Sequence, residues 1–161
     1  MGEFDVGQVC LNGHAVNGSY RNNPLSNKNH CERCGAKTII ECLNCETAIQ
    51  GVYRSDIFFG LPNWQPPAYC HNCGEPFPWT ESTIEAAQEL ANEIEELNDG
   101  ERAMLADSIE DLVKDSPMTK VAATRFNKLM LKVGKDTLLV FRELLIDVIS
   151  ESAKKIVWPN L

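Results

Sequence analysis

Residues 31–45 read "CERCGAKTIIECLNC" and place two Cys-x-x-Cys pairs close together in the chain. Such a pair presents two thiolates from one tight turn, and structural zinc takes four Cys or His ligands at the corners of a tetrahedron. The chain contains three of these pairs: Cys31/Cys34, Cys42/Cys45 and Cys70/Cys73. Three pairs complete one four-ligand site and half of a second, so one further two-ligand unit is expected.

Residues 10–14, "CLNGH", can supply that unit. The Asn-Gly step allows the backbone to turn tightly, so that Cys10 and His14 converge on one ion. Taken alone, the pattern also fits a solvated loop histidine beside a small buried cysteine; the unmatched third pair favours the ligand interpretation. Two other histidines adjoin cysteines, but His30 would strain a shared tetrahedron and His71 lies inside a Cys-x-x-Cys turn.

The eight ligands can be divided between two ions in two ways. Pairing along the chain gives consecutive sites, whereas a RING-like cross-brace joins the first unit to the third and the second to the fourth. The segment "GAKTIIE" between the second and third units is longer than a RING allows and suits a strand that leaves one ribbon and enters the next. The sequence therefore predicts one site from Cys10, His14, Cys31 and Cys34, and another from Cys42, Cys45, Cys70 and Cys73.

Two kinds of sequence meet near residue 79. Residues 1–79 hold every cysteine and histidine, and their apolar residues are too scattered to build a large core, so this part needs a staple. Residues 80–161 contain no cysteine and show the periodicity of helices. We expect a small α+β fold with a double zinc ribbon of short β-hairpins over 1–79 and an α-helical bundle over 80–161.

The helical part is predicted to contain four helices. The first begins near Thr80 or Ser82, which resemble N-caps, and stops at "NDG", residues 98–100. The second carries its apolar stripe over 104–113, and the third restarts at Ser116-Pro117. The fourth runs from about residue 136 to 157.

The fourth predicted helix has an unusually broad apolar side. A four-helix bundle can bury such a face, which is the simpler explanation. A second copy of the chain or a partner helix can equally cover it. The residues assigned to that partner surface are Phe141, Leu145, Val148 and Ile149.

The net charge of −8 is unevenly distributed. Residues 80–116 are strongly acidic, and residues 120–135 carry a basic series: Lys120, Arg125, Lys128, Lys132 and Lys135. Zinc ribbons often bind nucleic acids, which require a concentrated positive surface. Residues 1–79 have more Asp and Glu than Lys and Arg, so only the basic helix 120–135 offers one. Nucleic-acid binding is therefore the alternative hypothesis.

No pattern typical of an enzyme is present in the sequence. Closed four-ligand sites leave no open position for a substrate, and catalytic zinc usually has three protein ligands. The chain has no Gly-rich phosphate loop and no deaminase or nucleophile-elbow motif. We therefore expect that the protein is not an enzyme. The chain also lacks a transmembrane-length apolar run and a secretory signal, so we expect it in the cytoplasm, where thiols stay reduced.

The segments "CLNGH", "CERCGAKTIIECLNC", "QGVY" and "PAYCHNCGEPFPWTE" resemble an uncharacterised bacterial family with a double zinc ribbon and a helical C-terminal region. The resemblance is most specific over residues 8–82 and continues more loosely through "AATRFNKLMLKVGK" to "AKKIVWP". It implies a bacterial protein with two bound zinc ions, and it brings no established activity. One departure is Glu46, because the other Cys-x-x-Cys turns are followed by Gly35 and Gly74.

These features together predict an adaptor or scaffold with two structural zinc ions, which binds a protein partner or itself through its C-terminal helices.

The first test is the metal content. Four two-ligand units should hold two zinc ions per chain, measured by elemental analysis after gentle purification. A value near one for the metal-replete protein would contradict the two-site prediction.

Overall fold

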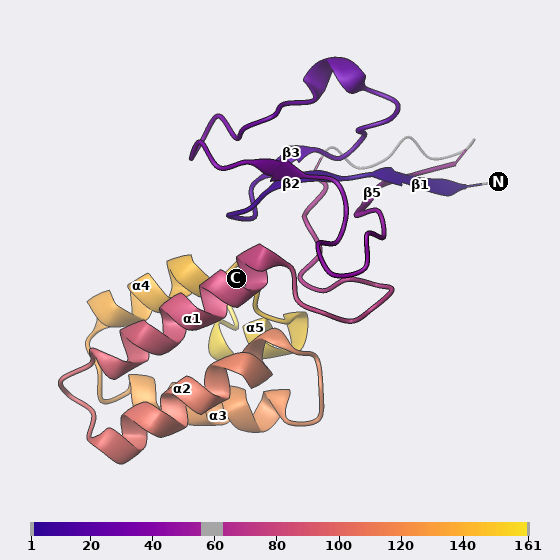
Figure 1. Cartoon of the computed structure of the whole chain (residues 1–161). Coiled ribbons are helices and arrows are strands. Elements are labelled where there is room, and N and C mark those ends of the chain that lie inside the picture. The colour runs from indigo at the N-terminus through magenta and orange to yellow at the C-terminus, as the bar shows by residue number, and fades with distance from the viewer. Residues whose placement is uncertain (1, 56–62, 161) are drawn as a thin grey trace. The chain divides into compact units, whose positions relative to one another are not determined.

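The computed structural model describes residues 2–55 and 63–160. The chain divides into two compact units, Met1–Glu81 and Ser82–Leu161, two residues beyond the boundary drawn from the sequence. The predicted α+β fold is confirmed: short antiparallel strands precede a helical region (Figure 1). No helix in the described ranges is both long enough and apolar enough to cross a membrane.

The strands of the first unit form two small sheets in the part of the chain that is described. In one, β1 (Glu3–Val6) pairs antiparallel with β5 (Gln50–Arg54). In the other, β2 (Gln8–Cys10) lies between β3 (Ala15–Asn17) and β4 (Thr38–Ile39). The second sheet positions metal-ligand candidates directly, because Cys10 ends its central strand opposite Thr38.

The apolar core of the first unit is small. Its main cluster contains four buried non-cysteine residues, Val9, Ile49, Phe77 and Trp79, and Val6 is also buried. The rings of Phe77 and Trp79 stack with centroids 4.7 Å apart. Two buried cysteines, Cys42 and Cys70, complete the cluster. So few apolar side chains cannot hold a domain of this size together, which agrees with the expected need for a staple.

A long loop joins β3 to the first Cys-x-x-Cys turn. It contains a short 3₁₀ helix, η1 (Pro24–Ser26), at its outer end (Figure 1). Three buried polar side chains on the strands, Asp5, Gln8 and Asn17, hold the loop by hydrogen bonds. The loop is therefore a built part of the unit.

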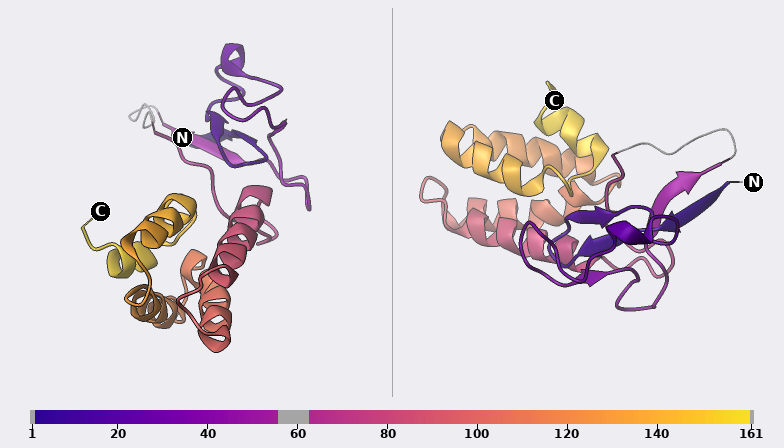
Figure 2. Two further views of the ribbon diagram at one scale, coloured as in Figure 1. Left: turned by 90° about the vertical axis from the view of Figure 1, so that its left-hand side faces the viewer. Right: turned by 90° about the horizontal axis from the view of Figure 1, so that it is seen from above.

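The helices of the second unit pack together in a bundle (Figure 2). The described helices are α1 (Pro78–Asn92), α2 (Asp99–Val113), α3 (Thr119–Met130), α4 (Lys135–Leu145) and α5 (Glu151–Val157). Phe126 of α3 lies at the centre of their core, with its ring edge-to-face against those of Phe141 and Trp158. Leu105, Ile109, Leu112 and Leu145 are also fully buried there.

Three helix boundaries differ from those predicted, and one of them is the start of the third helix, which lies at Thr119 and not at Ser116-Pro117. The first helix begins at Pro78, so Thr80 and Ser82 lie inside it, and the hydroxyl of Thr80 donates to the carbonyl of Ala68. The predicted stop signal at Asn98 is instead a start signal. Its side chain accepts from the amide of Glu101, whose carboxylate accepts from the amide of Asn98, so the pair forms a capping box.

The prediction of one long fourth helix was wrong, because the chain forms α4 and α5 with a turn between them. The reason is Ser150, which is not a good interior helix residue and has two better partners here. Its hydroxyl accepts from the amide of Ala153 and caps α5, while its own amide donates to the carbonyl of Leu112 at 2.9 Å. The second bond is tertiary and redirects the chain across the end of α2.

The break also changes the interpretation of the broad apolar face. Phe141, Leu145 and Ile149 are buried in the core of their own unit, and Val148 is partly buried against it. The four residues assigned to a partner surface therefore do not form an exposed face. The exposed apolar residues of α4 are Leu139, 52% exposed, and Val140, 48% exposed.

This difference predicts opposite effects for two neighbouring substitutions. Leu145→Asp places a charge in the core and should destabilise the helical unit by more than about 3 kcal/mol. Leu139→Asp adds the same charge on the outer side and should change stability by less than about 1 kcal/mol. Far-UV circular dichroism and thermal melting measure both effects. Equal melting temperatures for the two variants would contradict the burial described here.

Candidate metal centres

The three Cys-x-x-Cys turns share one backbone design. In each, the amide of the residue after the second cysteine donates to the carbonyl of the first cysteine, at 2.8, 2.8 and 2.9 Å. The amide of the first cysteine donates to a carbonyl five residues onward, as Cys31 does to Ala36. An antiparallel bridge then closes each turn: His30 to Lys37, Glu41 to Ala48 and Tyr69 to Pro76. This repeated turn points both sulfurs to one side.

The residue after the second cysteine has a positive φ in all three turns. Gly35 and Gly74 adopt φ values of 74° and 77°, which glycine reaches without strain. Glu46 adopts φ 60°, although it carries a Cβ atom. The departure noticed in the sequence therefore leaves the shape of the turn unchanged, and the second turn keeps its geometry in a conformation that glycine would adopt more easily.

The "CLNGH" segment builds a related turn that is one residue shorter. The amide of Gly13 donates to the carbonyl of Cys10 at 2.9 Å, and the amide of Cys10 donates to the carbonyl of His14 at 3.1 Å. Gly13 has φ 87°, and a Cβ atom there would lie 2.8 Å from the Cβ of Trp79. Both the conformation and the close approach require glycine at this position.

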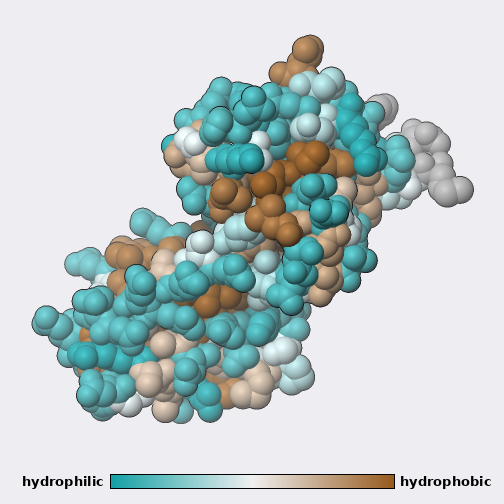
Figure 3. Space-filling view, in the orientation of Figure 1, coloured by the Kyte–Doolittle hydropathy of each residue, from teal (hydrophilic) through white to brown (hydrophobic). Residues whose placement is uncertain are grey.

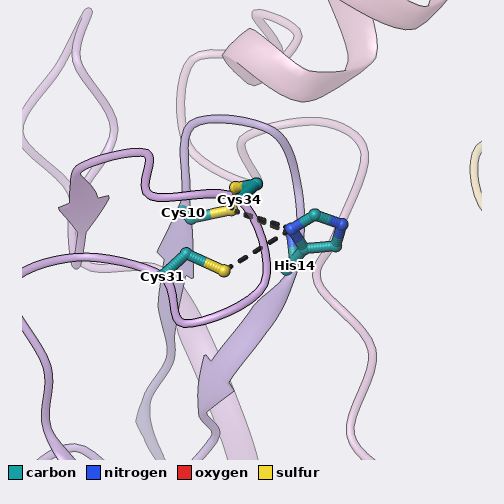
Figure 4. A group of neighbouring side chains, drawn as sticks. All are labelled: Cys10, His14, Cys31 and Cys34. Carbon is teal, nitrogen blue, oxygen red and sulfur yellow. Dashed lines mark hydrogen bonds between the residues drawn. The ribbon is translucent and has the colours of Figure 1, made fainter.

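These turns bring the first group of donors together. The ligand atoms of Cys10, His14, Cys31 and Cys34 all lie within 4.8 Å of one another. The Nδ1 atom of His14 is 3.5 Å from the sulfurs of both Cys10 and Cys31 (Figure 4). The sulfurs of Cys10 and Cys34 are 3.8 Å apart.

The second group contains four sulfurs. Those of Cys42, Cys45, Cys70 and Cys73 also lie within 4.8 Å of one another. The Cys42 and Cys73 sulfurs are 3.8 Å apart, and the Cys45 and Cys70 sulfurs are 3.6 Å apart. The units are thus grouped in chain order, as the sequence predicted, and not cross-braced.

The donor spacings fit a tetrahedral metal ion. Zinc–sulfur bonds of about 2.3 Å and zinc–nitrogen bonds of about 2.0 Å imply tetrahedral edges of about 3.8 Å between sulfurs and about 3.5 Å from sulfur to nitrogen. Three pairs of sulfurs lie 3.6–3.8 Å apart, two sulfur–nitrogen pairs lie 3.5 Å apart, and all donors of each group lie within 4.8 Å of one another. Thiolates and imidazole are also the donors that zinc prefers.

Asparagine side chains support one sulfur in each group. The Asn12 amide donates to Cys34 at 3.4 Å, and the Asn72 amide donates to Cys45 at 3.6 Å. Each asparagine belongs to one turn and each cysteine to the opposite turn of the same group. The two bonds therefore lock paired turns together, and the sequence analysis missed this role. The signal in the sequence was an Asn at the third position of three of the four turns: Asn12, Asn44 and Asn72.

Hydrogen bonding and burial separate the acidities of the thiols. The amide of Ala36 and the side chain of Asn12 lower the pKa of Cys34 to about 6. Hydrogen bonds with Thr47 and with the Asn72 side chain lower the pKa of Cys45 to about 6. In each group one thiol is thus already ionised at neutral pH, in the form that a metal requires.

Two of the buried thiols, those of Cys10 and Cys42, behave in the opposite way. Burial raises the pKa of Cys10, and it raises the pKa of Cys42 to about 11. A metal ion must displace the protons of these thiols, because only the thiolate is a ligand. Metal affinity should consequently fall as the pH is lowered.

The other histidines take no part in either group. His30 and His71 are exposed, and neither lies among the clustered donors of the described residues. His30 instead continues the antiparallel bridge to Lys37. The first group contains Cys10 and His14 instead. The sequence predicted these two residues because three Cys-x-x-Cys pairs need a fourth two-ligand unit.

The model of one bacterial family, described as "Uncharacterized protein conserved in bacteria (DUF2321)", matches residues 3–157. The chain belongs to this family. The match covers both the ribbon unit and nearly all of the helical unit, so the resemblance seen in the sequence is confirmed. No curated protein and no solved structure matches the chain.

The role of the single histidine donor can be tested with a matched pair. His14→Ala removes one corner of the first group, so the metal content should fall from two ions toward one under mild chelation. His71→Ala changes an exposed histidine beside the second group and should leave the content at two. Elemental analysis with a competing chelator measures both variants. If His14→Ala holds both ions as tightly as the unaltered chain does, His14 is not a ligand.

Proposed function

We infer that this family member is a non-catalytic zinc protein that acts as an adaptor. The observation that carries the proposal is the closure of both donor groups. Each group offers four donors at tetrahedral spacing, so a bound zinc ion would have no open position for a substrate or an activated water. Zinc in such sites holds the fold together, and the binding free energy becomes folding free energy.

The buried polar side chains support a non-catalytic role. Within the described ranges six polar or charged residues are buried: Asp5, Gln8, Asn17, Thr80, Ser108 and Thr119. Each makes a hydrogen bond that holds a turn, a loop or a helix. Catalytic groups typically occur as titratable side chains with perturbed pKa values in a cleft. The six buried polar residues instead make hydrogen bonds that stabilise the fold.

Surface features of the helical unit support binding to another protein. Leu139 and Val140 are adjacent on α4 and about half exposed, and apolar side chains reach the surface over this helix (Figure 3). Their neighbours Lys135, Asp136 and Glu143 are exposed and charged. A small apolar patch with a polar rim is the usual anatomy of a protein-binding surface.

Nucleic-acid binding through the basic segment is the second candidate. The observation that favours it is the exposure of four cations: Lys120, Arg125, Lys128 and Lys135. Lys132, however, pairs with Glu101, and the same hydrogen bond lowers the pKa of Glu101 and keeps it ionised. That pairing neutralises one of the five cations, in a chain whose net charge is −8.

One set of measurements separates the two candidates. In the adaptor proposal, Leu139→Asp should weaken self-association or partner binding about tenfold, measured by sedimentation, while Lys128→Ala has little effect. For a nucleic-acid binder, Lys128→Ala should reduce affinity for a defined single-stranded or duplex DNA and reduce the slope of affinity against salt. Salt-dependent DNA binding that Lys128→Ala weakens and Leu139→Asp does not would overturn the adaptor proposal.

A further inference from the structure

The loop of residues 18–30 is held to the strands by a series of hydrogen bonds with buried side chains. Asp5 accepts hydrogen bonds from the amides of Arg21 and Asn22, and from the Asn22 side chain. Burial raises the pKa of the Asp5 carboxyl, but these hydrogen bonds lower it by more. The net pKa is therefore below the ordinary value, and the carboxyl is ionised at neutral pH. Gln8 both donates to the carbonyl of Lys28 and accepts from its amide.

A third buried side chain fastens the middle of the loop. The amide group of Asn17 donates to the carbonyl of Asn23 and to the side chain of Asn27, at 2.9 and 2.7 Å. Asn27 in turn donates to the carbonyl of Tyr20. Burying polar groups is costly unless they are paired. Three of the six buried polar residues in the described part of the chain are committed to this one loop.

An apolar residue with a highly exposed side chain lies in the middle of this hydrogen-bonded loop. Leu25 in η1 is 97% exposed, so it contributes almost nothing to the stability of its own chain. Pro24 fixes φ on one side of it, and the side chain of Asn23 donates to the hydroxyl of Ser26 on the other. Single exposed apolar residues are common on protein surfaces. This one is held at the apex of a framework that buries three polar side chains.

We propose that loop 18–30 is a preformed docking element whose Leu25 inserts into an apolar pocket of a protein partner with an acidic rim. A rigid loop loses little conformational entropy on binding, and an aliphatic side chain that enters a pocket is an effective anchor. Arg21 is exposed, and the loop carries Arg21 and Lys28 without any Asp or Glu. Lys28 pairs with Glu32, so Arg21 is the cation that faces the partner's carboxylates.

The composition of the apex favours a protein over the other macromolecules. Residues 22–27, "NNPLSN", carry no charge, whereas phosphate contacts supply most of the affinity for nucleic acids. A membrane surface requires a larger apolar face than one leucine, together with several cations. A protein pocket requires only one well-placed apolar anchor with polar neighbours, which is what this apex presents.

The proposal gives the adaptor role a second contact surface, and its test does not depend on α4. A photo-crosslinking amino acid at position 25 of the full zinc-loaded chain, expressed in its native bacterium, identifies the contacted molecule. That protein is then purified and titrated with the full chain. Leu25→Asp should weaken binding about ten- to a hundredfold, the loss expected for one buried leucine. Arg21→Glu should also weaken binding to that protein, and the loss should be larger at low salt than at high salt.

Leu131→Asp is the matched control, because Leu131 is 88% exposed and lies in the helical unit. It should leave the affinity unchanged. Metal content and melting temperature confirm that each variant is folded, and Leu25→Ser replaces Leu25→Asp if the charged variant is not. Crosslinking to nucleic acid or lipid, the absence of any protein adduct, or equal weakening by Leu25→Asp and Leu131→Asp would overturn the proposal. Failure of Leu139→Asp alone would refute only the α4 surface.

Discussion

The convergence of cysteine and histidine donors is the constraint on which the first unit depends. Its apolar core has few members, and two of its buried side chains are themselves cysteines. The repeated turns solve the problem locally: each uses two backbone hydrogen bonds and one residue at positive φ to aim two donors in the same direction. The Asn12 and Asn72 side chains then tie each turn to its opposite number. A metal ion would replace the missing apolar core with directional bonds.

The parts of this structure that could be predicted are those set by local chemistry. Cys-x-x-Cys spacing specifies a turn, and counting the pairs assigns Cys10 and His14 to a common group, because four donors are needed for a closed site. Helical periodicity identified the helical region and most of its helices, although it joined α4 and α5 into one. The positive φ of Glu46 shows the same principle from the other side, since the surrounding turn imposes its backbone shape on a residue that does not favour it.

The parts that could not be predicted depend on residues distant in sequence. At Ser150 a strongly apolar segment is interrupted because the Ser150 amide donates to the carbonyl of Leu112. The residues next to position 150 in the sequence give no indication of this bond. The same is true of Asp5, whose carboxylate holds amides at positions 21 and 22. Apolar composition alone also could not divide the broad face of residues 138–149 into a buried side and an exposed side. That division follows from the break between α4 and α5.

The strand β4 has a consequence for how the two centres fill. It lies in the short segment that links Cys34 of one group to Cys42 of the other; Thr38 pairs with Cys10, and the carbonyl of Ile40 receives the amide of Ile49. A metal ion bound at either centre therefore orders one end of the segment 35–41, which connects the two centres. The first ion to arrive would remove part of the conformational search for the second, so binding at one centre should strengthen binding at the other.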